Sequence, residues 1–259
     1  MSEKVFVLGN GPSRANIDTS KLNGTVIGCN ACYRDFNPDV ICAIDAGIIS
    51  DIVESGFDGD CYFTHNSWNL LPAEVYSTVK NGSEYETERK AGDNNFVYIS
   101  GLTPNVKIDW SSGKNVPPTY QRYIIWVSKE KEHKIKNIGT EVMGWSTGTS
   151  AIHIACQDFT CNDYEKVHLL GFDHHNEYYD NIYADTDHYF SKYSKADIGG
   201  HKGTISEAWK TEYNKWDKQI IKVVEEHPAL QFIWVNYRGE NFPNLPNLFS
   251  KDEKDICQF

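Results

Sequence analysis

Lys4-Val5-Phe6-Val7-Leu8-Gly9-Asn10-Gly11-Pro12-Ser13 joins an apolar run directly to a glycine-containing loop near the start of the chain. Its first five residues form a short apolar run that ends at a glycine, which is typical of a strand buried on both faces of a parallel sheet. The two glycines permit a tight turn, and proline is favoured at the first position of a helix. Helix N-termini bind anions, so we predict a nucleotide phosphate at Asn10, Gly11 and Ser13. A plain strand-to-loop turn is the alternative.

Known dinucleotide and triphosphate motifs are incomplete at this loop. The pattern Gly-x-Gly-x-x-Gly fails, because Arg14, followed by Ala15 and Asn16, stands where the third glycine is needed, and the lysine of a P-loop is missing. The sequence therefore does not support NAD chemistry or P-loop ATP chemistry.

Similar apolar runs recur along the chain and alternate with helical patterns. The predicted strands are residues 4–8, 25–29, 39–44, 61–64, 123–127, 166–170 and 230–235, and the predicted helices are residues 46–55, 147–159 and 204–226. Strands that alternate with helices indicate an α/β fold. We predict one Rossmann-like domain, residues 1–259, with a mainly parallel sheet flanked by helices.

Two stretches break the alternation. Residues 70–118 are rich in Gly, Asn, Ser and Pro and are predicted as an irregular insertion. Residues 174–200 are rich in Tyr, His, Asp and Asn and follow the carboxyl end of a strand, where open α/β sheets bind ligands. We predict that they form an active-site lid. The alternating charges of Lys129 to Lys136 are typical of a solvated surface segment.

Charge and cysteine content narrow the function classes. The chain has 25 basic and 36 acidic residues, a net charge of −11 that disfavours nucleic acid and anionic lipid. It lacks an apolar run of roughly 18 residues and a signal peptide, so we expect a cytoplasmic protein without a membrane span. The seven cysteines are an odd number and are predicted to be free core thiols. The redox-like spacing of Cys29 and Cys32 is the alternative.

Short polar residues follow successive predicted strands. Asn30 and Asp45 come after the second and third strands, as Asn10 comes after the first. Amide groups suit a base or ribose, and a carboxylate suits a ribose hydroxyl or a metal. Each residue alone is also an ordinary turn-former.

A second set of polar residues lies at the start of the predicted helix 147–159. The N-terminus of this helix presents hydroxyls and backbone amides from Ser146, Thr147 and Gly148 to a bound ligand, so we predict that these residues contact the nucleotide. Plain N-capping is the alternative.

The predicted lid carries candidate catalytic and phosphate-binding residues. Asp173 at a strand end can orient a base or ribose, while His175, Tyr179 and Tyr183 can close over a phosphate or a substrate. His201 follows two glycines that would let a loop close, and its imidazole titrates near neutral pH, which favours a general base. Asp185 and Asp187 form an Asp-x-Asp pair that offers an alternative metal site.

Taken together, five motifs resemble the ordered motifs of glycosyltransferase family 42, the bacterial sialyltransferases. They are residues 7–13, Cys29-Asn30, Ser146-Thr147-Gly148, Gly171-Phe172-Asp173 and Ile198-Gly199-Gly200-His201. The resemblance implies a GT-A-like Rossmann variant with a lid. It also implies transfer of a sialic-acid-like sugar from a CMP-activated donor to a glycan hydroxyl, with inversion, without a metal or prosthetic group. His201 would be the base, and His175 and Tyr183 would stand at the family's two phosphate-binding tyrosines.

Two departures keep other functions open. His175 replaces a family tyrosine and Asp45 replaces a family asparagine. The glycine loop and Gly171-x-Asp173 also resemble the 6-hydroxymethylpterin diphosphokinase-like family, which implies ATP and Mg²⁺ held near Asp45 and Asp173. A catalytically silent nucleotide-binding protein is the third hypothesis, and a homo-oligomer stays open.

Overall fold

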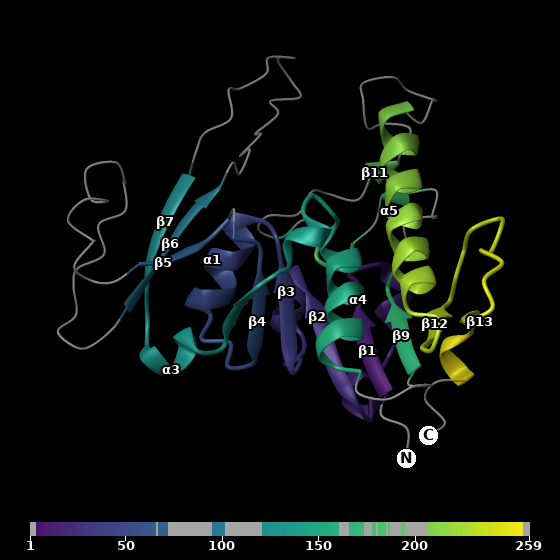
Figure 1. The fold of residues 1–259 in the computed structure, drawn as a ribbon, viewed down its shortest axis with the longest axis horizontal. Coiled ribbons are helices and arrows are strands. Elements are labelled where there is room, and N and C mark those ends of the chain that lie inside the picture. The colour runs from purple at the N-terminus through teal and green to yellow at the C-terminus, as the bar shows by residue number, and fades with distance from the viewer. Residues whose placement is uncertain are drawn as a thin grey trace. The chain divides into compact units, whose positions relative to one another are not determined.

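The computed structural model describes residues 4–65, 67–71, 95–101, 121–160, 166–173, 178–179, 181–184, 186, 193–194 and 207–255. The chain divides into two compact units (Figure 1). The first unit is Met1–Cys42 with Glu141–Phe259, and the second is Ala43–Thr140.

Six parallel strands form the sheet of the first unit, in the order β13-β12-β9-β1-β2-β3. Their bounds are β1 Lys4–Leu8, β2 Thr25–Cys29, β3 Val40–Ala43, β9 Lys166–Leu170, β12 Gln231–Val235 and β13 Leu248–Lys251. The chain runs from β1 to β2 and β3 on one side and resumes with β9 on the other. The strand order therefore reverses between β1 and β9, the position where open α/β sheets bind ligands.

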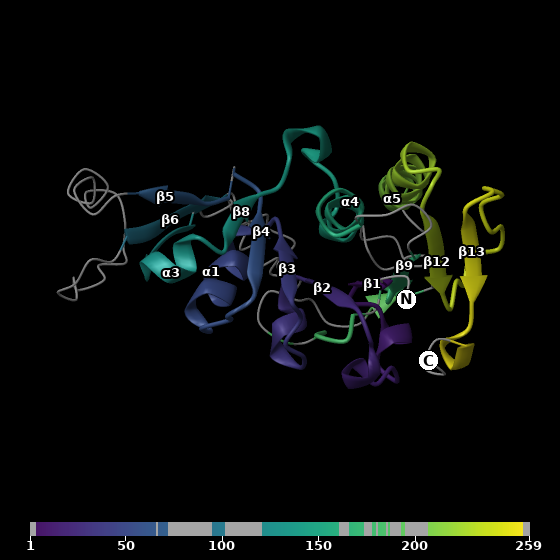
Figure 2. The same cartoon turned by 60° about the horizontal axis from the view of Figure 1, so that its bottom comes forward.

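Side chains from both faces of this sheet are buried. Helices α4 (Thr147–Asp158) and α5 (Glu207–Glu226) lie side by side over one face (Figures 1 and 2). On β1, Phe6 and Leu8 join a core cluster with Ile17 and Cys32, which come from the segments that follow β1 and β2. Burial on both faces explains why β1 reads as an unbroken apolar run.

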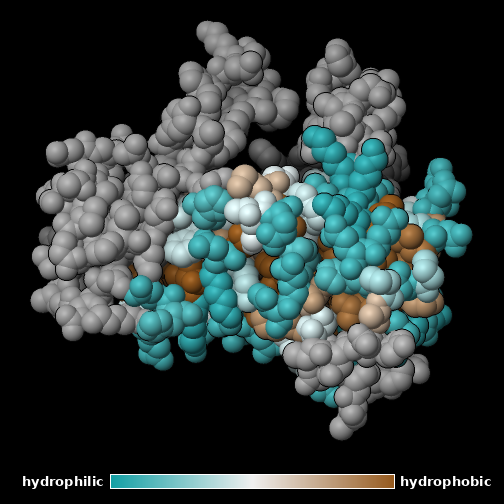
Figure 3. Space-filling model, in the orientation of Figure 1, coloured by the Kyte–Doolittle hydropathy of each residue, from teal (hydrophilic) through white to brown (hydrophobic). Residues whose placement is uncertain are grey.

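Helix α5 is amphipathic. Ile220, Val223 and Val224 are buried, whereas Lys222 and Glu225 are exposed. The hydrophilic surface that Figure 3 shows over this helix follows from that pattern. Among the described helices, none is long and apolar enough to cross a bilayer.

The second unit combines parallel and antiparallel strands. Helix α1 (Ala46–Glu54) precedes β4 (Asp60–Phe63), which pairs in parallel with β8 (Ile135–Asn137) after the short helix α3 (Lys129–Glu132). Strands β5 (Asn69–Leu71), β6 (Asn95–Gly101) and β7 (Gln121–Val127) form an antiparallel sheet. The eight parallel strands and their helices give the chain the α/β Rossmann-like fold that the sequence predicts.

Two local predictions need correction. Residues 123–127 are a strand, as predicted, but β7 pairs antiparallel with β6 instead of joining the parallel sheet. Within the predicted irregular insertion 70–118, residues 70 and 71 belong to β5 and residues 95–101 form β6. The predicted surface segment Lys129 to Lys136 forms α3 and part of β8. Glu130, His133 and Lys136 are exposed, as predicted, and Ile135 is buried against β4. The described parts of the predicted lid include a two-stranded antiparallel pair, β10 (Tyr178–Tyr179) and β11 (Tyr193–Ser194).

The prediction of free core thiols is confirmed for the described cysteines. Cys29, Cys32, Cys42, Cys61 and Cys156 are free and buried. Burial raises the pKa of the Cys32 thiol to about 11, so it is protonated at neutral pH. The Cys29–Cys32 spacing therefore serves packing, and Cys32 lies in the core cluster beneath β1.

A buried histidine makes the stability of the fold depend on pH. His168 on β9 is 5% exposed and stacks on Phe6 with a ring-centroid distance of 4.7 Å. Burial lowers the pKa of His168 to about 4. Above about pH 6.5 both the folded and the unfolded chain hold it neutral, and below that only the unfolded chain takes up the proton. The folded state therefore loses stability as the pH falls from about 6.5 toward 4.

We expect His168→Leu to remove this acid sensitivity. Between about pH 7.5 and pH 5, wild-type protein should lose about 2 kcal/mol more unfolding free energy than the variant, because His168 resists protonation. Urea denaturation at the two pH values measures this difference. The exposed His133 supplies the control, and His133→Leu should keep the wild-type difference. Equal pH dependence in wild type and His168→Leu would show that His168 does not cause the loss.

Candidate functional site

Two loops meet where the strand order of the first unit reverses. Leu8 of β1 is in register with Leu170 of β9, so Gly9 and Gly171 leave the sheet at the same edge. The Gly9 amide donates to the Leu170 carbonyl at 2.7 Å, and the Gly11 amide donates to the Gly171 carbonyl at 2.9 Å. A Cβ at Gly9 would lie 2.5 Å from the Gly171 carbonyl oxygen. These glycines therefore allow the two loops to pack closely against each other.

The amides that follow the glycine loop already have an anionic partner. Pro12–Arg14 is the 3₁₀ helix η1, three residues long, with Pro12 at its first position. Its Ser13 amide donates to Oδ2 of Asp173 at 2.7 Å. The Asp173 carboxylate therefore occupies the position at the Ser13 amide where the sequence predicts a phosphate.

Polar atoms beside the two loops are buried without protein partners. Asn30 follows β2 with a positive φ of 51°, a conformation that asparagine tolerates better than most residues. Asn30 Oδ1 and Ser13 Oγ are buried, and neither atom has a hydrogen-bond partner among the residues that the structure describes. Asn10 Nδ2 donates to the Cys29 carbonyl at 3.1 Å, which fixes this side chain against the end of β2. Buried polar atoms of this kind indicate a ligand or water, since most buried polar groups are paired.

The start of α4 is capped from within the protein. Ser146 Oγ accepts from the Thr149 amide at 3.2 Å, and Gln219 of α5 accepts from both the Ser146 amide and the Thr149 hydroxyl. Thr147 is 7% exposed, and a Cβ at Gly148 would lie 2.9 Å from the Phe172 ring. The alternative of plain capping therefore accounts for Ser146, and Gly148 permits close packing on the Gly171–Asp173 loop.

Tyr183 contacts two residues, Arg14 and Asp35, that are not among the predicted site residues. Its hydroxyl accepts from Arg14 Nη2 at 2.7 Å and donates to Asp35 Oδ1. Arg14 is 2% exposed and Tyr183 is 6% exposed. Burial, and then the hydrogen bond with Asp35, raise the pKa of Tyr183 well above its ordinary range, so the hydroxyl stays protonated and keeps donating. The sequence offers one signal for this contact: Arg14 lies immediately after the glycine loop.

The remaining predicted residues fall elsewhere. Asp45 belongs to the second unit, where it directly precedes α1. His175, Asp185, Asp187 and His201 lie outside the described residues, and Tyr179 is described only through the backbone of β10. Within the described parts of the chain, no cluster of three or more His, Cys, Asp or Glu side chains is arranged to hold a metal ion.

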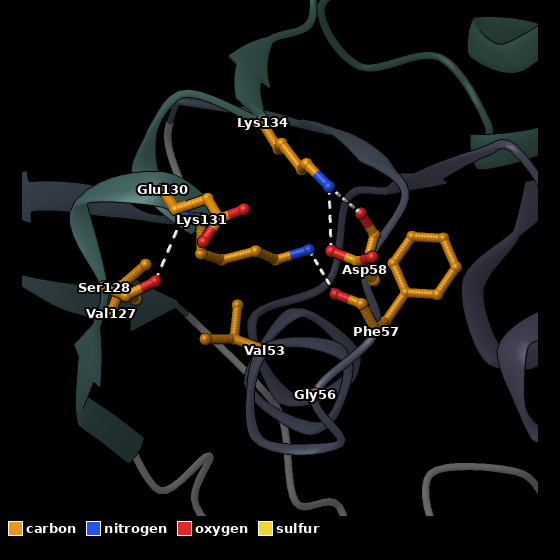
Figure 4. A pocket seen from close by; sticks show the side chains of 9 residues that line it. All are labelled: Val53, Gly56, Phe57, Asp58, Val127, Ser128, Glu130, Lys131 and Lys134. Atoms are coloured by element: carbon orange, nitrogen blue, oxygen red, sulfur yellow. Dashed lines mark hydrogen bonds and ion pairs between the residues drawn. The ribbon is translucent and has the colours of Figure 1, made fainter.

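The second unit contains a pocket of about 300 Å³ that includes none of the predicted site residues (Figure 4). Lys131 extends into it and donates through Nζ to the Phe57 carbonyl, and Lys134 pairs with Asp58 at 2.8 Å (Figure 4). Lys131 Nζ also donates to the Gly59 carbonyl at 3.2 Å. These lysines hold the turn between α1 and β4. They therefore serve the fold of the second unit.

The fold and this arrangement of loops define an α/β protein of Rossmann-like architecture with a polar cluster at its switch point. No protein-family model matches the chain, and no curated protein matches it. Among solved structures, the chain is similar to a crystal structure of the sialyltransferase CST-II in complex with a trisaccharide acceptor and CMP. The identity is 11%, the match covers 89% of this chain and 80% of that chain, and the TM-score is 0.38. This likeness is too weak to identify a function.

Proposed function

We propose that the chain is a nucleotide-dependent glycosyltransferase that transfers a sialic-acid-like sugar from a CMP-activated donor to a glycan hydroxyl, with inversion. The observation that carries the proposal is the edge of three adjacent strands, β9, β1 and β2. There Asp173, the glycine loop and Asn30 converge, and Asn30 Oδ1 and Ser13 Oγ are buried without protein partners. An open α/β sheet binds nucleotides at such an edge.

The chemistry of these atoms supports a nucleoside better than a phosphate at the loop. An amide oxygen such as Asn30 Oδ1 accepts from a ribose hydroxyl or from the amino group of cytosine. A phosphate at Ser13 would meet the Asp173 carboxylate, which already accepts from the Ser13 amide. We therefore propose that the base and ribose contact Ser13 and Asn30, and that the phosphate lies toward the predicted lid residues His175 and Tyr179.

The reaction follows from the sequence resemblance. The acceptor hydroxyl oxygen attacks the anomeric carbon while the bond from that carbon to the phosphate oxygen of CMP breaks. CMP leaves with the bonding electrons, and the hydroxyl proton passes to His201 as general base. Attack opposite the leaving group inverts the anomeric centre. The contribution of Tyr183 is to positioning, since its hydroxyl already binds Arg14 and Asp35.

Thermal titration with CMP, CDP, UDP, GDP and ATP, each with and without Mg²⁺, tests the nucleotide class. A ligand at about 100 times its Kd adds about 2.7 kcal/mol of stability, so we expect CMP without metal to raise the Tm by about 5 °C or more. A response to ATP that needs Mg²⁺ would favour the diphosphokinase-like function instead. No response to any nucleotide would contradict a nucleotide site.

Matched asparagine variants locate the response. Asn30→Gly keeps a backbone that tolerates positive φ and removes the amide, so it should reduce the CMP-induced shift. Asn236 also has a positive φ, 55°, and directly follows β12 of the same sheet. Asn236→Gly should keep the shift relative to its own Tm. Equal shifts in both variants would remove Asn30 from the site.

A further inference from the structure

Residues 181–184 and 186, which we call the clasp, lie against the glycine loop of the first unit. The Ile182 amide donates to the Asn10 carbonyl at 3.0 Å. Farther along, Arg34 Nη1 donates to the Thr186 hydroxyl at 3.0 Å. The clasp is therefore attached at both ends to segments that follow β1 and β2.

Tyr183 fastens the middle of the clasp. Its hydroxyl uses its acceptor capacity for Arg14 and its donor for Asp35, and the Arg14 guanidinium lies 5.8 Å from the centre of its ring. Arg14 Nη1 also lies 3.5 Å from Asp35 Oδ2. Because Arg14 and Tyr183 are buried, water competes little for these charge-assisted bonds.

The three residues come from three separate parts of the chain. Arg14 ends η1, directly after the glycine loop, and Asp35 caps the carboxyl end of η3 (Asn30–Arg34), which begins at Asn30. The contact of Arg14, Asp35 and Tyr183 thus joins the two 3₁₀ helices beside Asn10 and Asn30 to the clasp. Release of Tyr183 would remove the bonds that fasten the middle of the clasp to both 3₁₀ helices.

We propose that Arg14 and Asp35 are positioning residues that hold Tyr183, and through it the clasp, against the glycine loop, and that this contact sets the affinity of the nucleotide site. The effect on affinity rests on the proposed function. When only a fraction of the molecules hold the arrangement that binds the ligand, the apparent Kd equals the intrinsic Kd divided by that fraction. Loosening the clasp therefore raises the Kd for CMP without removing any group that touches the nucleotide.

Tyr183→Phe and Asp35→Asn test the contact, because both keep the size of the side chain. The first removes the hydroxyl that bonds Arg14 and Asp35, and the second removes the carboxylate charge that this hydroxyl and Arg14 face. We expect amide hydrogen exchange at Ile182 to accelerate about 10-fold without nucleotide and the Kd for CMP to rise about 10-fold, since a hydrogen bond to a charged group is worth about that factor. Exchange is read by amide NMR and the Kd by calorimetry on the folded protein. Tyr237→Phe is the control, because it removes a hydroxyl that donates to the Asn241 carbonyl at 2.8 Å in the same unit.

The two readouts separate the possible failures. A lower Tm with an unchanged Kd would show a purely structural contact and overturn the proposed effect on affinity. Unchanged exchange at Ile182 in Tyr183→Phe would show that the clasp does not depend on this hydroxyl. No CMP binding by wild-type protein would count against the proposed function and the effect on affinity together, while the exchange measurement would still decide whether the three residues hold the clasp.

Discussion

Gly171→Ala is expected to lower the free energy of unfolding by about 3 kcal/mol or more, because two costs add at this position. Gly171 has a φ of +74°, which alanine rarely adopts, and a Cβ there would lie 2.7 Å from the Gly9 carbonyl oxygen. That oxygen belongs to backbone fixed by the hydrogen bonds between the two loops. Relief of the clash would separate the loops, so the nucleotide response should disappear as well. Urea denaturation measures the loss of stability.

Gly144→Ala separates the cost of the backbone conformation from that of the contact. Gly144 has nearly the same φ, +79°, but a Cβ there meets nothing within 4 Å. We expect this variant to cost only about 1 kcal/mol. Equal costs for the two variants would mean that the close approach of Gly9 and Gly171 does not constrain the fold.

His201→Ala is expected to lower turnover by about 100-fold or more while the affinity for CMP changes little. The usual contribution of a general base is of this size, and the base contacts the acceptor hydroxyl instead of the nucleotide. The prediction rests on the sequence resemblance, because His201 lies outside the described residues. Initial rates with a CMP-sugar donor, together with the Kd for CMP from calorimetry, give the two values.

The exposed His65 provides the control for this experiment, and His65→Ala should keep the wild-type turnover. Unchanged turnover in His201→Ala would remove this histidine from the mechanism. A large increase in the Kd for CMP would assign His201 to donor binding instead.

The sequence predicts the first unit of the fold well because its strands are buried on both faces. The apolar runs at residues 4–8, 25–29 and 166–170 match β1, β2 and β9 at both ends. The second unit is predicted less well. A run such as residues 123–127 indicates a strand but does not specify its partner. The partner β6 lies within residues 70–118, a stretch rich in Gly, Asn, Ser and Pro that the sequence indicates as irregular. In the first unit, strand β13 is not predicted, because Leu248 alone among its residues is buried and the sequence there shows no apolar run.

The candidate site is predictable only in part. The register of parallel strands brings Asn10, Asn30 and Asp173 to one edge, as the positions after each strand indicate. The bond from the Ser13 amide to Asp173 spans 160 residues, and the contact of Arg14 with Tyr183 spans 169. No local pattern encodes such pairs, because each depends on how loops far apart in the sequence pack after the sheet has formed.

The most direct test of the account is a titration of uniformly ¹⁵N-labelled protein with CMP, without metal, followed at the backbone amides. We predict that the chemical-shift changes concentrate at Gly11, Ser13 and Asn30 and saturate together with one Kd. Changes centred on the Lys131 pocket of the second unit, or no saturable change at the glycine loop, would contradict a nucleotide site at the edge of β9, β1 and β2.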